Sequence, residues 1–317
     1  MCTFLHLYIS FCTFHLYISF CTFCSWILYI LYISFEMYIF PDVWKLPKII
    51  PIPKPNKDLT EGGSYRPISL LSPITKTLEK VILPYITSNI PQVNHQHGFK
   101  TSHSTTTALH QLTNQIIQGF NHKLPPERAI VVSLDKAFTS KAFTGKAFTS
   151  KAFDTVNIHL LIKKLHKTKV PNVLIKFIAN YIKGRKGFTL YHGFKSKLQQ
   201  FKTGVPQGGV LSPVLFNLYT SDIPNPPPGV SLTTYADDMN PAASHSKYKT
   251  AEQRLQPYLH DIFNWTKRND LKLNPDKSTA TLFTPDKHEH NITLDLSMLL
   301  FSASGWIWQR IHSAISC

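Results

Sequence analysis

Two strand-like runs that lie far apart in the chain both end in aspartate, and this feature constrains the fold most. The first run, AIVVSLD (129–135), is continuously apolar until its final acid, as expected of a buried strand. The second, VSLTTYADDMN (230–240), predicts a strand that enters a tight turn at Asp237 and Asp238. Adjacent carboxylates repel, so burying both is costly unless a cation neutralises them. A metal site at the ends of the two strands would meet this requirement.

The acids indicate which metal and which chemistry this site would serve. Oxygen ligands with no His or Cys nearby suit Mg²⁺, with Mn²⁺ as the alternative. Two such ions, about 3.5–4 Å apart, would stabilise the attacking and leaving oxygens of a phosphoryl transfer. A third carboxylate is then needed from another strand, and Asp135 ends a run of the right kind. Asp135, Asp237 and Asp238 are therefore candidate metal ligands.

The charge balance points to a polyanionic partner. The chain holds 34 basic and 18 acidic residues, a net charge of +16. Residues 155–221 contain no acid, and phosphate contact is the favoured interpretation of this stretch over a solvated face. Its basic residues are Lys163, Lys164, Lys167, Lys169, Lys176, Lys183, Arg185, Lys186, Lys195, Lys197 and Lys202.

The first forty residues differ from the rest of the chain. The phrases CTFLHLYISF, CTFHLYISF and CTFCSWILYILYISF are copies of one another. We favour a translated repeat with no selected role, and a membrane segment is the alternative because the apolar length is sufficient to span a bilayer. The predicted organisation is an apolar repetitive tail (1–43), a main domain (44–290) and a divergent C-terminal tail (291–317).

The main domain has mixed α/β patterning. Apolar residues at helical spacing predict helices over 156–165 and 171–184, the second ending at Gly184. The stretch 187–204 predicts a hairpin, and 211–223 a further helix. Pro241 lies where a second strand should follow the acidic turn, which suggests an edge strand or an early break.

Seven phrases, in order, make the chain similar to the reverse transcriptases of non-LTR, LINE-type or jockey-like retrotransposons. They are IIPIPKPNKD (49–58), YRPISLL (65–71), HQHGFKTSHSTTTAL (95–109), VVSLD with KAFDTVNIHLLIKKL (131–165), GVPQGGVLSPVLFNLY (204–219), YADD (235–238) and NDLKLNPDKST (269–279). The resemblance implies an α+β right-hand polymerase, with fingers and a palm built on an antiparallel sheet. The thumb is expected to be missing or truncated, as in a fragment of a larger mobile element.

The resemblance also implies a function and its partners. The activity would be RNA-directed DNA polymerisation, a nucleotidyl transfer that uses an RNA template, a DNA primer and deoxynucleoside triphosphates. The alternative is an inactive remnant that only binds nucleic acid, and an RNA-dependent RNA polymerase is a more distant reading. The family's location is nuclear or cytoplasmic, whereas a membrane location would follow only from residues 1–40.

Site roles follow from the resemblance position by position. The catalytic residues would be Asp135, Asp237, Asp238 and Lys277, the last as proton donor to pyrophosphate. The nucleotide would be bound by Lys57, Arg66, Phe153, Gln207 and Gly208. Lys54 is the alternative to Lys57, and Phe138 is the alternative to Phe153 as the aromatic gate against the sugar.

A repeat interrupts this pattern beside the first acid. Lys-Ala-Phe occurs four times at five-residue spacing between Asp135 and Asp154. This period fits neither a helix nor a strand, so the repeat should form a loop. Removing residues 136–148 would restore the family's spacing. We assign the metal to Asp135, expect Asp154 to start the next helix, and expect the palm to form with impaired or absent catalysis.

Overall fold

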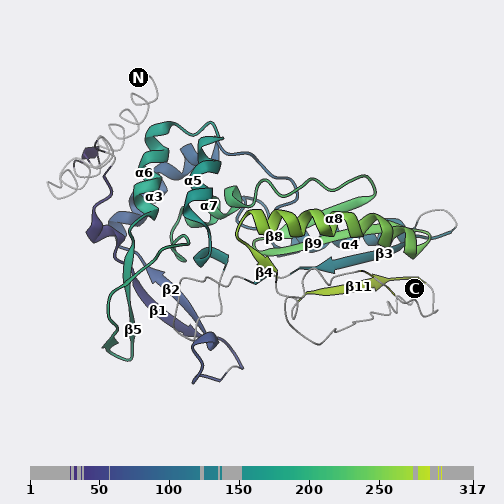
Figure 1. Cartoon of the computed structure of the whole chain (residues 1–317), viewed down its shortest axis with the longest axis horizontal. Coiled ribbons are helices and arrows are strands. Elements are labelled where there is room, and N and C mark those ends of the chain that lie inside the picture. The colour runs from purple at the N-terminus through teal and green to yellow at the C-terminus, as the bar shows by residue number, and fades with distance from the viewer. Residues whose placement is uncertain are drawn as a thin grey trace.

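The chain folds into two lobes that lie side by side along its long axis (Figure 1). The computed structural model describes residues 29, 32–33, 37, 39–56, 58–121, 125–134, 136–137, 152–273, 278–285, 292 and 294. Each lobe is built on its own sheet, and the helices of the first lobe share a continuous apolar core with the second. This is the fingers-and-palm arrangement expected from the sequence.

The first lobe, the fingers, combines a small sheet with a group of helices. The strands run in the order β2-β1-β5-β6, with β7 also paired to β5. They are β1 (Lys48–Pro53), β2 (Tyr65–Leu70), β5 (Lys186–Tyr191), β6 (Phe194–Lys195) and β7 (Gln199–Gln200). The helices are α3 (Pro73–Thr87), α5 (Ile158–His166), α6 (Asn172–Ile182) and α7 (Ser212–Tyr219), with short 3-10 turns η1 (Asp42–Lys45), η2 (Gly62–Ser64) and η3 (Ala152–Asp154).

The local predictions for this lobe are confirmed. Helix α5 begins after Asn157, whose side-chain oxygen accepts hydrogen bonds from the N–H groups of His159 and Leu160. Helix α6 ends just before Gly184, which has a φ of 68° that suits a helix terminus. The predicted hairpin is β5 with β6 and β7.

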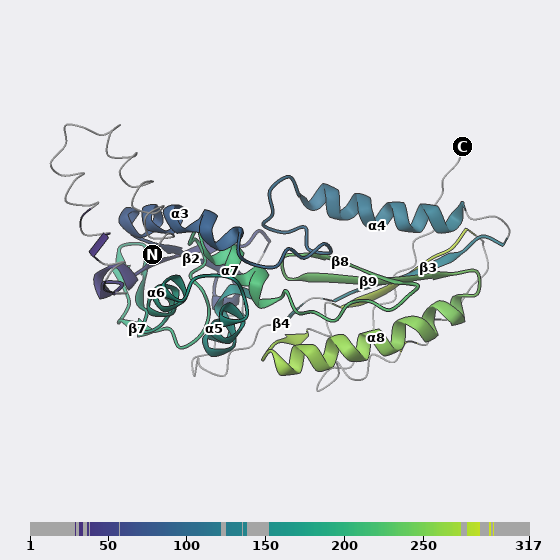
Figure 2. The same ribbon diagram turned by 90° about the horizontal axis from the view of Figure 1, so that it is seen from above.

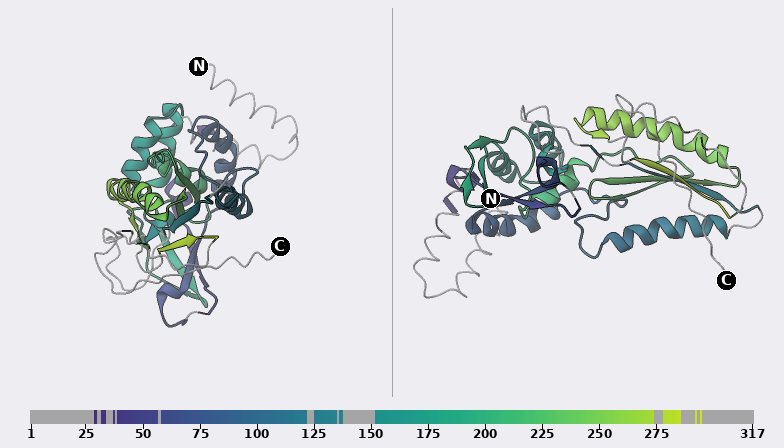
Figure 3. Two further views of the ribbon diagram at one scale, coloured as in Figure 1. Left: turned by 90° about the vertical axis from the view of Figure 1, so that its right-hand side faces the viewer. Right: turned by 90° about the horizontal axis from the view of Figure 1, so that it is seen from below.

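The second lobe, the palm, is an antiparallel sheet with a helix on each face. Its strands run in the order β11-β3-β9-β8. Helix α4 lies along one face and α8 along the other (Figure 2), and the view from below repeats this layering (Figure 3). The bounds are β3 (Arg128–Ser133), β8 (Val230–Tyr235), β9 (Asp238–His245), β11 (Thr279–Phe283), α4 (Thr105–Phe120) and α8 (Tyr248–Arg268).

Burial on both faces explains why β3 is apolar along its length. Ala129 and Val131 pack with Ile116 of α4, whereas Ile130 and Val132 face the main core. A strand with one solvated face would alternate apolar and polar residues, and this strand does not. The sheet therefore carries the run that ends at Asp135 through its interior.

Pro241 does not mark an edge strand. Strand β9 lies between β3 and β8 and continues through Pro241, which pairs with Leu232 of β8. The regular pairing of β9 with β3 ends where Val131 pairs with Ala242, and the two segments pair again where Leu134 faces Met239. The gap falls beside the proline because proline has no N–H to donate. The prediction of an edge or early break was wrong for the strand, although the ladder is interrupted there.

The predicted tails lie largely outside the described residues. Within the described parts of the chain, no helix has the length and apolar character needed to cross a bilayer. Residues 1–28 and 295–317 are not described, so the boundaries at 43/44 and 290/291 stay predictions.

Candidate active site

Strands β8 and β9 are joined by a tight turn that carries the adjacent acids. Tyr235 pairs with Asp238, so Ala236 and Asp237 form the turn. Ala236 has a φ of 54°, a value that residues with a β-carbon seldom adopt. Asp237 is half-buried and Asp238 is exposed. The predicted strand and turn are confirmed, and both acids lie at one end of the palm sheet.

The run that ends at Asp135 leads to the same end of the sheet. The Leu134 N–H donates to the Met239 carbonyl oxygen at 2.8 Å, and the Met239 N–H donates back to the Leu134 oxygen at 3.2 Å. Met239 directly follows Asp238 in the chain. Asp135 lies outside the described residues, so its meeting with Asp237 stays a prediction.

The segments flanking two of the proposed site residues also pair with each other. Strand β4 (Lys136–Ala137) is antiparallel to β10 (Lys272–Leu273). The first strand follows Asp135, and the second precedes Lys277 by a few residues. Lys277 is outside the described residues, as are Lys57 and Phe138. Their predicted roles stay predictions.

Gln96, which no sequence motif singles out, contacts the acidic turn. Gln96 is buried, and its Oε1 accepts hydrogen bonds from the N–H groups of Ala236 at 3.0 Å and Gly98 at 2.7 Å. Its Nε2 donates to the Ala236 carbonyl oxygen at 3.3 Å. No pattern in a single sequence signals such a contact, because the two segments are 140 residues apart.

The predicted nucleotide-binding turn at Gln207 and Gly208 packs on strand β2. The Ser69 N–H donates to the Gln207 carbonyl oxygen at 2.8 Å. Gly208 has a φ of 119°, and a β-carbon there would lie 2.7 Å from the Ser69 oxygen. Arg66, on the same strand, is exposed. Strand β2 thus carries Arg66 and also contacts the turn at Gln207 and Gly208.

A buried acid from α3 supports the residues after this turn. The Glu79 carboxylate accepts hydrogen bonds from the Tyr181 hydroxyl and from the Val210 N–H, just before α7. Burial raises the pKa of the Glu79 carboxyl, although these hydrogen bonds act in the opposite direction. The sequence does not signal this contact, because a single Glu in an amphipathic helix usually faces solvent.

The last copy of the Lys-Ala-Phe repeat packs against the chain that leads into the turn at Gln207 and Gly208. The Val205 N–H donates to the Phe153 carbonyl oxygen at 2.7 Å, and the Gly204 N–H donates to the Val156 oxygen at 2.8 Å. The Phe153 ring lies between those of Phe99 and Phe216, with centroid distances of 5.5 and 5.2 Å. Phe153 therefore has a fixed position beside the turn, and its role as the gate stays a prediction.

Asp154 does not start the following helix. It belongs to the 3-10 turn η3, and α5 begins only at Ile158. Asn157 caps that helix, so an acid is not required there. The expectation for Asp154 was wrong, because Asn157 supplies the cap three residues further along the chain.

Gly204 provides a test of this packing. Its φ is 84°, and a β-carbon would lie 2.6 Å from backbone atoms of Asp154. Gly193 has a φ of 83° with nothing within 4 Å, so it is a matched control. We expect Gly204→Ala to lower the free energy of unfolding by about 3 kcal/mol and Gly193→Ala by about 1 kcal/mol, measured by urea denaturation. Equal losses would contradict the packing.

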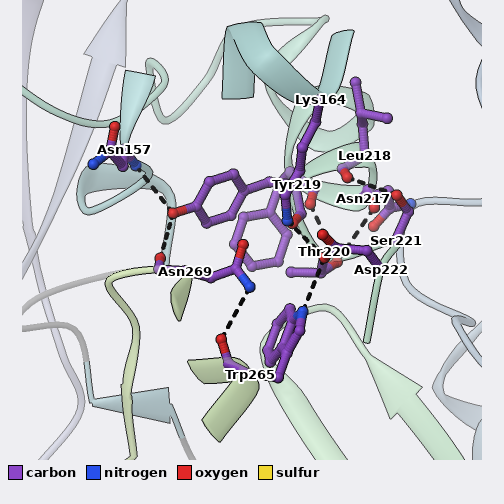
Figure 4. A network of polar contacts seen from close by, with 11 residues as sticks. Asn157, Lys164, Asn217, Leu218, Tyr219, Thr220, Ser221, Asp222, Trp265 and Asn269 are labelled. Atoms are coloured by element: carbon purple, nitrogen blue, oxygen red, sulfur yellow. Dashed lines mark hydrogen bonds and ion pairs between the residues drawn. The ribbon is translucent and has the colours of Figure 1, made fainter. Parts of the chain in front are cut away.

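A polar network fixes the end of α8 against α7 (Figure 4). Lys164 Nζ donates to the Asp222 carboxylate at 2.6 Å and to the Tyr219 carbonyl oxygen at 2.5 Å. The Trp265 indole N–H donates to the same carboxylate at 2.9 Å, and the Tyr219 hydroxyl donates to the backbone carbonyl oxygen of Asn269. Burial lowers the pKa of Lys164 against the effect of Asp222, and raises the pKa of Tyr219 to about 12. The network positions the segment that leads to β10.

The basic residues of the acid-free stretch divide into two kinds. Lys164 belongs to the network above, and Arg185 is buried, donating to the carbonyl oxygens of Thr203 and Gly204. The other nine are exposed. Phosphate contact therefore stays a prediction for those nine, whereas Lys164 and Arg185 act in the fold.

The acids at the turn fit a hard cation but do not form a complete site by themselves. Among the residues that the structure describes, no three His, Cys, Asp or Glu side chains are grouped to hold a metal ion. Asp237 and Asp238 supply two carboxylates at one end of the sheet. Asp135, the third ligand that the sequence predicts, lies outside the described residues, so a three-acid site stays a prediction.

Fold and turn together define the fingers and palm of a polymerase. The family model for reverse transcriptase (RNA-dependent DNA polymerase) matches residues 52–294, and the chain belongs to this family. Members of the family use divalent metal ions.

The chain is similar to polymerases of Drosophila melanogaster mobile elements. It is 33% identical over 256 residues to the probable RNA-directed DNA polymerase from transposon BS, and 30% identical over 259 residues to the enzyme from mobile element jockey. Each match covers 77% of this chain and 26% of the relative, so the chain spans about a quarter of their length. The predicted likeness to jockey-like elements is confirmed.

Among solved structures, the chain resembles a telomerase from Candida tropicalis, determined in complex with a fragment of telomeric RNA. The TM-score is 0.50 at 12% identity, covering 76% of this chain and 41% of the telomerase. At this identity the match supports the fold alone.

Proposed function

We propose that the chain carries the fingers and palm of an RNA-directed DNA polymerase from a retrotransposon. The enzyme would add deoxynucleotides to the 3′-hydroxyl of a DNA primer paired with an RNA template. We assign the metal more specifically as Mg²⁺, which when bound would neutralise negative charge on the reacting oxygens. Family membership and the relatives' activity support this proposal.

One observation carries the proposal beyond family membership. The reciprocal hydrogen bonds between Leu134 and Met239 hold the end of the β3 run beside the acidic turn. If the same pairing continued by one residue on each strand, position 135 would lie opposite Asp238. Three carboxylates would then converge from two strands, as a pair of divalent ions requires.

The remaining predicted residues would bind and orient the nucleotide. Arg66 would place its planar guanidinium on the triphosphate, and the Gln207–Gly208 turn, held by the same strand, would lie beneath the nascent pair. Phe153 would pack against the sugar, with Lys57 and Lys277 supporting the phosphates and the leaving pyrophosphate. Correct orientation is the main contribution that such residues make to this chemistry.

The inactive-remnant hypothesis rests on the repeat beside Asp135. Residues 136–148 separate that acid from the segment at Phe153, which the family keeps close to it. A remnant with this insertion would keep the exposed basic surface and bind nucleic acid in a salt-sensitive manner. Metal-dependent incorporation of nucleotides is the property that separates the two hypotheses.

A primer-extension assay tests the proposed function. We expect Mg²⁺-dependent incorporation of dTTP on a poly(rA) template with an oligo(dT) primer, by the chain or by its 136–148 deletion variant. Failure of both to incorporate dTTP would reject the polymerase and favour the remnant. Incorporation of UTP instead would favour an RNA polymerase.

A further inference from the structure

We propose that Gln96 is a positioning residue whose carboxamide fixes the acidic turn and, through it, the direction of the Asp237 and Asp238 carboxylates. This inference rests on the proposed function, since it gives the turn its chemical task. Gln96 comes from the segment between α3 and α4, far from the turn in sequence. It would act on the backbone of the turn and would not touch the reacting atoms.

The contacts of Gln96 use most of what an amide side chain offers. Its Oε1 accepts from two backbone N–H groups, Ala236 at 3.0 Å and Gly98 at 2.7 Å. Because backbone N–H groups only donate, these two bonds fix which end of the amide is the oxygen. The Nε2 then points to the Ala236 carbonyl oxygen at 3.3 Å. A glutamine side chain has both the acceptor oxygen and the donor nitrogen that these three hydrogen bonds require.

The turn needs these partners because the hairpin does not supply them. Ala236 is outside the ladder between β8 and β9, and it is 8% exposed. A buried backbone N–H or C=O without a hydrogen-bond partner is costly, so the N–H and C=O of Ala236 need partners from outside the hairpin. Gln96 bonds both groups of Ala236. It thereby stabilises the positive φ of this residue, which the alanine side chain disfavours.

The segment that carries Gln96 is itself attached to the palm sheet. The Thr234 N–H donates to the His95 oxygen at 2.7 Å, and the His97 N–H donates to the Thr234 oxygen at 2.9 Å. These bonds on either side of Gln96 form a parallel bridge to β8. The side chain therefore starts from a fixed backbone position, as precise positioning requires.

Gly98 allows the segment that carries Gln96 to approach the backbone of the turn closely. A β-carbon at Gly98 would lie 2.4 Å from the Ala236 nitrogen. Helix α7 holds the same residue, since the Asn217 side chain donates to the Gly98 carbonyl oxygen at 2.9 Å. The turn is thus enclosed by a segment that is bonded to both β8 and α7. A change at Ala236 would move Asp237, the next residue, by rotating its backbone.

The test compares Gln96→Met with Gln115→Met. Methionine keeps the length of glutamine but makes none of its three bonds. Gln115 lies on α4, and its side-chain oxygen accepts a hydrogen bond from the Ser231 hydroxyl at 2.9 Å. Ser231 is on β8 but far along the strand from the turn, so Gln115 is the matched control. We expect Gln96→Met to lower kcat about a hundredfold with the KM for dTTP within about threefold, because misplacing a reacting group by about 1 Å has this effect. The control should leave both unchanged.

A second readout does not depend on activity. Amide hydrogen exchange at Ala236 and Gly98 should become at least about tenfold faster in Gln96→Met, while Leu134 and Met239 keep their protection. Unchanged kcat and unchanged exchange at Ala236 would overturn the inference. If the parent chain and its 136–148 deletion variant extend no primer, the proposed function fails alone, and the exchange rates still decide whether Gln96 holds the turn.

Discussion

Asp237→Asn should abolish Mg²⁺-dependent primer extension, with a loss of at least about a thousandfold in kcat. Asparagine has the shape of aspartate but no charge, so it is a poor ligand for a hard cation. Losing about 4 kcal/mol of transition-state stabilisation corresponds to a thousandfold in rate. The measurement is single-turnover extension in whichever form of the chain, intact or shortened at 136–148, extends primers best.

The control for this substitution is Asp261→Asn. Asp261 is an exposed acid on α8 and is not one of the predicted site residues, so its loss should leave extension unchanged. The fold should survive Asp237→Asn, and in metal-free buffer its melting temperature should be equal or higher, because Asp237 and Asp238 repel one another without a cation. An Asp237→Asn variant with more than about a tenth of the parent rate would be incompatible with a metal ligand at this position.

Much of the fold could be predicted because its signals are local. The continuous apolar run of β3 reports burial on two faces, and helical spacing in α5 and α6 reports one buried face each. The turn at Ala236 and Asp237 was predictable because a strand pattern stops at two polar residues. These features depend on residues that are neighbours in the chain, which is where periodicity carries information.

The support around the candidate site could not be predicted in the same way. Gln96 and Glu79 act through contacts with residues more than a hundred positions away, and neither has a sequence pattern that reports its partner. Pro241 was misleading for a different reason. Proline excludes one hydrogen bond on one side of a strand, and β9 accommodates that loss between two neighbours instead of at an edge.

The second large effect concerns the repeat. Deleting residues 136–148 should raise kcat at least about a hundredfold over the intact chain, since misplacement of a reacting group by about 1 Å is enough to cost that much. The structure shows what the deletion would act on. The segment at Phe153 is already bonded to Gly204 and Val205, so the deletion shortens the chain between Asp135 and a fixed point.

The deletion removes strand β4 and brings two other residues into its place in the chain. Lys136 and Ala137 pair with β10 through their backbone, and Thr149 and Ser150 would take their places after Asp135. Stability should change little, since each halving of loop length is worth only about 0.6 kcal/mol. Removing one repeat unit, 141–145, is the matched control, because it keeps part of the insertion and should stay impaired. Equal, high activity in the intact chain and the deletion variant would mean that the repeat leaves Asp135 in place.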